Sequence, residues 1–237
     1  MRRLMALAVL FMAIAAIGAT PAATKVRFEK SYIPLFFDSN DRSQVVLAGT
    51  YPDTCYQGGG VQLQIDKINR VIRATQWAFV SPENCLPALV PFHSILDLGR
   101  LEPGVYSIED GLSGDNLGYL PVTLAKDSGP GNHYNYIAPV SDAYVEKNPT
   151  TGQSELVLQG TWADRCTHFK EVNLFYQRDV LIVQPIVEPL NAEDSRDCAL
   201  QLGRFQKRIP LRPMAERTYL LHVRTMDGNT INKIIND

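Results

Sequence analysis

Apolar and polar residues alternate with a period of two along much of the chain. In the segment 61–66, Val61, Leu63 and Ile65 are separated by polar side chains, and the segment 172–175 keeps the same parity. This alternation is typical of strands with one face in a core and the other in solvent. The chain also contains 16 glycines and 15 prolines, and no amphipathic run is long enough to predict a helix. The pattern therefore predicts an all-β protein.

The alternating segments divide into two groups of about seven strands each. In the first half they lie near 26–37, 43–51, 60–67, 70–79, 90–98, 104–109 and 117–125. In the second half they lie near 134–145, 154–162, 170–177, 180–187, 204–211, 217–225 and 229–235. Seven short strands in about 100 residues are typical of an immunoglobulin-like antiparallel β-sandwich.

The two groups share a repeated motif. Gly-Thr-aromatic-x-Asp-x-Cys occurs at 49–55 and again at 160–166, and matching residues continue in the same order as far as Tyr106 and Tyr219. A register this constant indicates an internal duplication, so we expect β-sandwich repeat 1 at 24–126 and repeat 2 at 127–237. The polar, glycine-rich segment 126–132 is the expected linker.

One loop in each half carries a tyrosine in a recognisable setting. The segment Leu101-Glu102-Pro103-Gly104-Val105-Tyr106 resembles the tyrosine corner of fibronectin-type (fibronectin-III-like) and immunoglobulin-like domains, and Tyr219 ends the equivalent segment. The resemblance covers one loop per half and implies that each tyrosine hydroxyl donates to the backbone of the loop before it. No cysteine follows either tyrosine by two residues, so the antibody-type disulfide between sheets is not expected.

The first 23 residues predict a cleaved signal peptide. Arg2 and Arg3 precede an unbroken apolar run at 4–17, and small residues then lead to a cleavage site between Ala22 and Thr24. The run is shorter than the roughly 20 apolar residues that a membrane-spanning helix needs. An uncleaved anchor is the alternative. No cysteine follows the run, so a lipid anchor is not indicated, and we expect a secreted or periplasmic protein.

Export predicts that the four cysteines form disulfides. Four cysteines allow three pairings, and only Cys55–Cys85 with Cys166–Cys198 treats the two halves alike. Zinc bound by the four thiolates is the alternative, but the chain has no Cys-x-x-Cys spacing. No cofactor or metal is therefore predicted.

Asp53 and Asp164 are the most notable charged residues, because each precedes a cysteine by two positions. They are candidates for binding a cation or a polar ligand at the ends of the sandwiches. An Asx turn, in which the carboxylate accepts backbone N–H bonds, explains the same spacing without a ligand, and we favour it.

The segment 58–60, Gly-Gly-Gly, is not a phosphate-binding loop, since it lacks the lysine and the following helix. A flexible loop is the better interpretation.

Aromatic residues and histidines supply the remaining candidates. His133, Tyr134 and Tyr136 follow the linker, and Trp77 and Trp162 lie in or at the ends of predicted strands. Exposed aromatic rings between two domains stack on sugar rings or anchor a peptide, or else pack the domains together, and we favour packing. None of the four histidines has His-x-His or His-x-x-x-His spacing.

The formal net charge of −2 gives no electrostatic reason to expect nucleic acid as a partner. No catalytic motif is assembled, so the sequence predicts an exported, non-enzymatic binding, adhesion or structural protein with a protein or glycan ligand. The alternatives are a secreted hydrolase with a site at the interdomain cleft around His133 or His168, and a protein similar to the periplasmic pilus chaperones, which also contain two immunoglobulin-like domains.

Overall fold

The computed structural model describes residues 20–82, 84–125, 137–188, 198, 200–213 and 218–236. Most of these residues lie in β-strands, and a short 3-10 turn, η2 (Met226–Gly228), precedes the last strand. No helix within these ranges is long and apolar enough to cross a membrane. The prediction of an all-β protein is confirmed.

The strands of the first half are β1 (Ala22–Val26), β2 (Lys30–Tyr32), β3 (Phe37–Asp38), β4 (Ser43–Tyr51), β5 (Tyr56–Asp66), β6 (Val71–Val80), β7 (Val90–Gly99), β8 (Gly104–Asp110) and β9 (Asn116–Thr123). Those of the second half are β10 (Val140–Lys147), β11 (Ser154–Asp164), β12 (Phe169–Gln177), β13 (Val180–Val187), β14 (Leu200–Pro210), β15 (Thr218–Arg224) and β16 (Thr230–Asn236). Most bounds lie within a few residues of the predicted ones.

The N-terminal part differs most from the sequence prediction. The segment expected to be one strand at 26–37 is divided between β2 and β3, and β1 precedes it. The signal cleavage predicted between Ala22 and Thr24 falls within β1. Residues 1–19 of the predicted signal peptide and the predicted linker at 126–132 lie outside the described residues.

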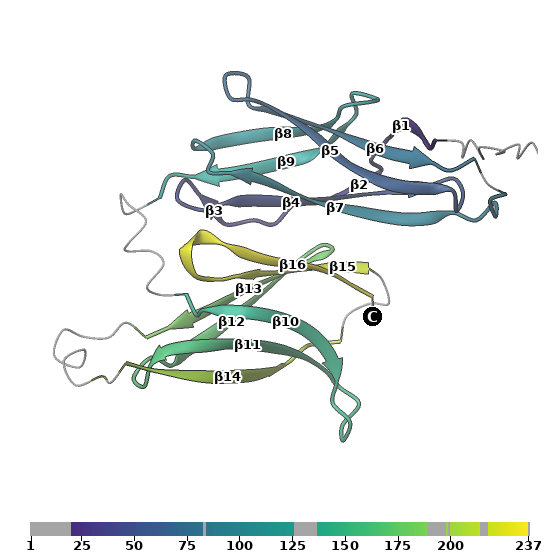
Figure 1. Cartoon of the computed structure of the whole chain (residues 1–237). Helices are drawn as coiled ribbons and strands as arrows, with labels where there is room; N and C mark the ends of the chain where they lie inside the picture. Colours follow the sequence, from purple (N-terminus) through teal and green to yellow (C-terminus); the bar gives the residue numbers. More distant parts are fainter. Residues whose placement is uncertain are drawn as a thin grey trace, which may run out of the picture.

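The strands form four sheets that lie in layers (Figure 1). In the first half, sheet A (β1, β3, β5, β6, β8 and β9) faces sheet B (β2, β4 and β7). In the second half, sheet C (β12, β13, β15 and β16) faces sheet D (β10, β11 and β14). Sheets B and C are the two middle layers, so sheets A and D form the outer ones (Figure 1).

The larger sheets of the two halves share one order of pairing. β5–β6 is antiparallel, β6–β8 parallel and β8–β9 antiparallel, and β12–β13, β13–β15 and β15–β16 repeat this series. Each sandwich therefore contains a parallel pair, whereas antiparallel sheets were expected, because alternation in a sequence carries no information on strand direction. In each half the parallel strands are joined through a strand of the opposite sheet, β7 or β14, which gives the chain room to return in the same direction.

The prediction of a flexible loop at Gly58–Gly60 is wrong, since these residues belong to β5. The register between β5 and β6 shifts between Gly58 and Val61, which marks a β-bulge. Gly60 has a φ of +89°, a conformation that glycine adopts without the strain other residues would incur.

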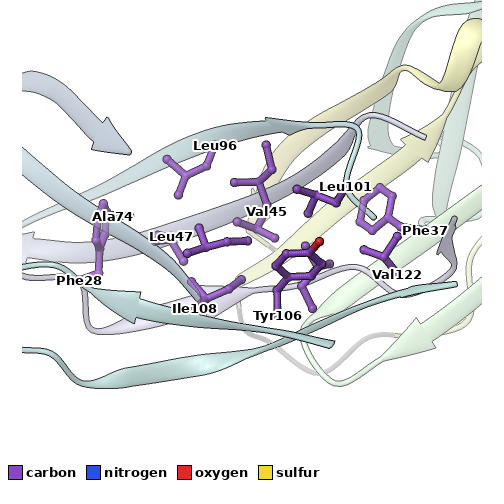
Figure 2. Close-up of a cluster of buried hydrophobic side chains, with 13 residues drawn as sticks. Phe28, Phe37, Val45, Leu47, Ala74, Leu96, Leu101, Tyr106, Ile108 and Val122 are labelled. Carbon is purple, nitrogen blue, oxygen red and sulfur yellow. The ribbon is translucent and has the colours of Figure 1, made fainter. Parts of the chain in front are cut away.

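Each sandwich has its own core. In the first half, Val45 and Leu47 of β4 meet Tyr106 and Ile108 of β8, and all four are 0 % exposed (Figure 2). The Tyr106 hydroxyl donates to the carbonyl oxygen of Glu102 at 3.1 Å, which is the bond that the resemblance to a tyrosine corner implied. Tyr219 is buried in the second half, but the loop at 214–217 before it lies outside the described residues.

The repeated glycine makes room for an aromatic stack in the first half. The rings of Tyr51 and Phe92 stack with their centroids 4.3 Å apart. A Cβ atom at Gly49 would lie 2.7 Å from Phe92 Cζ and 2.8 Å from the carbonyl oxygen of Arg27. Only glycine therefore lets the Phe92 ring cross β4 at this point.

The same arrangement recurs in the second half. Trp162 and Phe205 stack with their centroids 4.3 Å apart. A Cβ atom at Gly160 would lie 2.4 Å from Phe205 Cζ and 2.2 Å from the carbonyl oxygen of Pro139. The Gly-Thr-aromatic part of the motif thus has a packing role in both halves.

Disulfides join Cys55 to Cys85 and Cys166 to Cys198, with sequence separations of 30 and 32 residues. The predicted pairing is confirmed. Each disulfide links the segment after β4 or β11 to the connection before β7 or β14.

The two halves pack together through sheets B and C. Tyr32 and Val46 of the first half form one cluster with Val180, Ile182 and Leu220 of the second, and none of the five is more than 5 % exposed. These strands bury their other face in their own sandwich, so both faces of β4, β13 and β15 are covered. This explains why these strands depart from simple alternation.

Candidate functional site

Asp53 and Asp164 hold the turns that begin the disulfide-closed segments. Asp53 Oδ1 accepts the N–H of Cys55 at 2.9 Å. Asp164 Oδ1 accepts the N–H of Cys166 at 2.8 Å and that of Thr167 at 2.7 Å. The hydrogen bonds from Thr167 and Cys166 hold the pKa of Asp164 below its usual value. Both carboxylates therefore act as Asx-turn acceptors.

The Asp53 carboxylate and the sulfur atoms of Cys55 and Cys85 all lie within 4.8 Å of one another. Both sulfurs belong to the disulfide, so neither is a thiolate that could bind a metal. The group therefore offers a cation one carboxylate instead of three ligands.

The predicted residues His133, Tyr134 and Tyr136 lie outside the described residues.

The expectation that Trp77 and Trp162 pack the two domains together is wrong. Trp162 packs against Phe169, with ring centroids 5.0 Å apart, and against Phe205 within the second half. Trp77 lies on β6 of sheet A, the outer layer on the side away from the second half (Figure 1). The buried side chains of the cluster between sheets B and C come from β2, β4, β13 and β15. Neither tryptophan lies on one of these strands, so neither belongs to that cluster.

His168 is one of the two histidines around which the hydrolase alternative places a site. Its Nδ1 lies 2.8 Å from the carbonyl oxygen of Cys166, and its Nε2 lies 3.2 Å from Glu188 Oε2. The hydrogen bond to Cys166 and that to Glu188 raise the pKa of the exposed imidazole. Since acceptors hold both ring nitrogens, this imidazole is not placed to take a proton from a serine or cysteine nucleophile.

A groove of about 590 Å³ lies at the junction of the two halves. We call it the interdomain groove. The first half contributes β2 with its flanking residues and part of β9, and the second half contributes the turn between β12 and β13. Its lining residues are Glu29–Ile33, Leu117–Tyr119 and Gln177–Val180. Its size is within the range of about 300–1,000 Å³ that small-ligand sites occupy.

An ion pair crosses the interdomain groove from one half to the other. Lys30 Nζ lies 2.7 Å from Asp179 Oδ2 and 4.6 Å from the centroid of the Tyr32 ring. Partial burial lowers the pKa of Lys30, but the hydrogen bonds to Asp179 and Tyr32 outweigh it, so this pKa lies above its usual value. The groove thus presents an ion pair with one partner from each half.

Backbone and side-chain hydrogen bonds fix the walls of the groove. The Ser31 hydroxyl donates to the carbonyl oxygen of Leu117 at 2.5 Å, which ties β2 to β9. The N–H of Leu220 donates to the carbonyl oxygen of Asp179 at 2.8 Å, which ties the β12–β13 turn to β15. These bonds fix the backbone segments that carry Lys30 and Asp179.

A histidine at the interface is fully buried. His222 is 0 % exposed, and its ring lies edge-on to Phe37 of the first half with centroids 5.4 Å apart. Its Nδ1 donates to Asn232 Oδ1 at 2.7 Å, and the Asn232 amide donates to Gln44 Oε1 of the first half at 2.6 Å. Its Nε2 has no hydrogen-bond partner among the described residues. Burial lowers the pKa of His222 to about 4.

Sequence reasoning missed Lys30, Asp179 and His222 as site residues. Lys30 and Asp179 are far apart in the chain and belong to different halves, so no local spacing links them. The one available signal was the position of Asp179 in the short connection between two predicted strands, which is also where ordinary turn residues occur.

Comparison with protein-family models finds no matching family. Comparisons with curated proteins and with solved structures find no match either. The assignment of a function therefore depends on the site itself.

Proposed function

We propose that this chain is an exported, non-enzymatic binding or adhesion protein whose ligand occupies the interdomain groove. The observation that carries the proposal is the groove itself, because segments of both halves line it and an ion pair crosses it. A ligand in this position would contact Lys30 and Asp179 together. The lining contains two basic and two acidic residues, Lys30, Arg178, Glu29 and Asp179, and hydroxyl groups, which suits a polar ligand such as a peptide segment or a glycan.

The covered interface supports a binding role. The apolar cluster between sheets B and C holds the two sandwiches in one arrangement, so the groove exists before a ligand arrives. A preformed site avoids the free-energy cost of ordering on binding. The two disulfides are compatible with the export that the N-terminal sequence predicts.

We also propose that the two halves arose by duplication. The shared pairing order of sheets A and C, the repeated glycine–aromatic stack and the equivalent disulfides support this origin.

The test is a binding screen of the chain from Thr24 onwards against a glycan array and a random peptide library. A Lys30→Met, Asp179→Asn double variant should weaken binding of the selected ligand at least about tenfold, or ~1.4 kcal/mol. Lys233→Met is the matched control, since Lys233 forms a comparable exposed ion pair with Asp142 away from the groove. Turnover of ester, peptide or glycoside substrates would contradict the non-enzymatic role.

A further inference from the structure

Strand β6 presents two aromatic side chains on the outer face of sheet A. Ile72, Ala74 and Ala78 are 0 % exposed and define the core face of this strand, so Trp77 and Phe79 point to the opposite face. Phe79 is 45 % exposed, and Trp77 is half-buried. Alternate residues on a strand are about 7 Å apart, so the two side chains leave the same face of the sheet at neighbouring positions.

A glycine on the neighbouring strand β5 leaves room beside the Phe79 ring. Gly59 of β5 lies within the bulge opposite β6. A Cβ atom at Gly59 would lie 3.1 Å from Phe79 Cε2 and 3.2 Å from the carbonyl oxygen of Trp77. A larger residue at this position would therefore crowd the Phe79 ring and the backbone at Trp77.

Neutral amides and one ammonium group surround the rings. Trp77 Nε1 donates to Gln62 Oε1 at 3.4 Å, and Gln57 of β5 lies opposite Phe79 of β6 in the strand pairing. Lys25 Nζ lies 5.1 Å from the centroid of the Trp77 ring, a contact that is weak at exposed sites. Aromatic faces with amide and ammonium groups beside them match a ligand that has apolar ring faces and hydroxyl edges.

The equivalent face of sheet C in the second half shows which side chains a sheet surface needs in order to pack against another protein sheet. Sheet B covers that face, and it is apolar at Ile182 and Leu220. Strand pairing places Arg73 and Ser107 at the equivalent positions of sheet A, so a second protein sheet would have to bury a guanidinium group. Two aromatic side chains supply about 300–500 Å² of contact surface, less than the roughly 800 Å² per partner in a stable protein interface.

We propose that the Trp77–Phe79 face binds a neutral oligosaccharide. Its pyranose rings would stack on the two aromatic rings, and its hydroxyl groups would bond to the amides of Gln57 and Gln62 and to Lys25. This site is separate from the interdomain groove, so it adds a ligand class and a second location to the proposed function.

The test is a titration of the chain from Thr24 onwards with cellohexaose, chitohexaose and maltohexaose. The chain contains two tryptophans, so Trp162→Phe leaves Trp77 as the only tryptophan and keeps an aromatic ring in the second-half stack. Saturable quenching or a spectral shift of Trp77 fluorescence is expected with at least one of the sugars. Calorimetry should then show at least about tenfold weaker binding for Phe79→Ala and for Trp77→Ala.

Val105→Ala is the matched control, since Val105 is 57 % exposed on the outer face of the same sheet. It should bind as the unchanged protein does. Phe79→Ala removes a partly exposed ring and decides the test if Trp77→Ala does not fold. Gly59→Ser keeps both rings but crowds that of Phe79, so it should also bind more weakly.

Absence of saturable binding to all three sugars, or unchanged binding by Phe79→Ala, would overturn the inference. Binding that is lost only in the Lys30→Met, Asp179→Asn variant would also overturn it, while leaving the groove as the ligand site.

Discussion

The guanidinium group of Arg224 and the carboxylate of Asp41 form a buried ion pair between the two halves. Arg224 Nη2 lies 2.5 Å from Asp41 Oδ1, and the two side chains are 9 % and 2 % exposed. Asp41 Oδ2 also accepts the N–H of Asp38 at 2.9 Å, so the carboxylate is fixed within the first half. The pair therefore connects β15 to the segment after β3.

Asp41→Ala should destabilise the protein by about 3–5 kcal/mol, because it removes the Asp41 carboxylate from the buried Arg224 guanidinium. The free energy of unfolding in urea measures this effect. Asp142→Ala is the control, since it removes an exposed ion pair with Lys233 and should cost no more than about 1 kcal/mol. A cost below 1 kcal/mol for Asp41→Ala would show that the pair does not support the interface.

Stability should decline as the pH falls from about 6.5 towards 4, because His222 is buried in its neutral form. Burial lowers its folded-state pKa to about 4, so below its unfolded value of roughly 6.5 the unfolded chain binds the proton more tightly. The full loss is on the order of 3 kcal/mol. Asp41 acts in the opposite direction, since burial raises its pKa despite Arg224, and its protonation in acid favours the folded state.

Urea unfolding between pH 4.5 and 7.5 measures this slope. His222→Gln replaces the imidazole with an amide that does not titrate, and it should reduce the slope over that range. An equal slope in the variant and the unchanged protein would assign the acid sensitivity to another group.

Gly49→Ala and Gly160→Ala should each destabilise the protein by about 1–3 kcal/mol, because the added methyl group meets a phenylalanine ring and a backbone carbonyl. Thermal unfolding measures the effect. Gly203→Ala is the control, since a Cβ at Gly203 in β14 meets no atom within 4 Å. If all three variants melted at the same temperature, the packing role of the repeated glycine would be refuted.

Removal of either disulfide by paired Cys→Ala substitutions should cost roughly 3–4 kcal/mol, because a crosslink over about 30 residues limits the unfolded chain. Chemical denaturation of the Cys55→Ala, Cys85→Ala variant and of the Cys166→Ala, Cys198→Ala variant measures this cost. Peptide mapping without reduction checks the pairing itself. A peptide that joins Cys55 to Cys166 or Cys198 would contradict it.

The sequence predicted the strands well where the chain packs within one sandwich. Alternation located β5 and β7, and the matching cysteine positions identified both disulfides. Alternation was less informative where both faces of a strand are buried, as at Val46 beside Val45 in β4. Both faces of such a strand are apolar, so the sequence does not distinguish them. It also carried no information on the parallel pairing of β6 with β8.

The interface between the halves, and the site beside it, were not predictable from local patterns. Tyr32, Val180 and Leu220 are ordinary apolar strand residues until the two sandwiches meet. Trp77 was a candidate residue in the sequence, but the prediction placed it in the contact between the halves. The sequence alone does not tell which face of a sandwich another part of the chain covers. The Asx turns at Asp53 and Asp164 were recoverable because their hydrogen bonds span only two or three residues.

The stacking of sheet B on sheet C joins two unlike surfaces, and such a head-to-tail contact can in principle continue from one molecule to the next as a filament. The outer faces of sheets A and D, on which further molecules would stack, oppose that growth. Arg73 stands on sheet A where Ile182 stands on sheet C, and Gln159 stands on sheet D where Ala48 stands on sheet B. Polymerisation through this contact would bury both polar side chains, and the cost of removing them from water disfavours it.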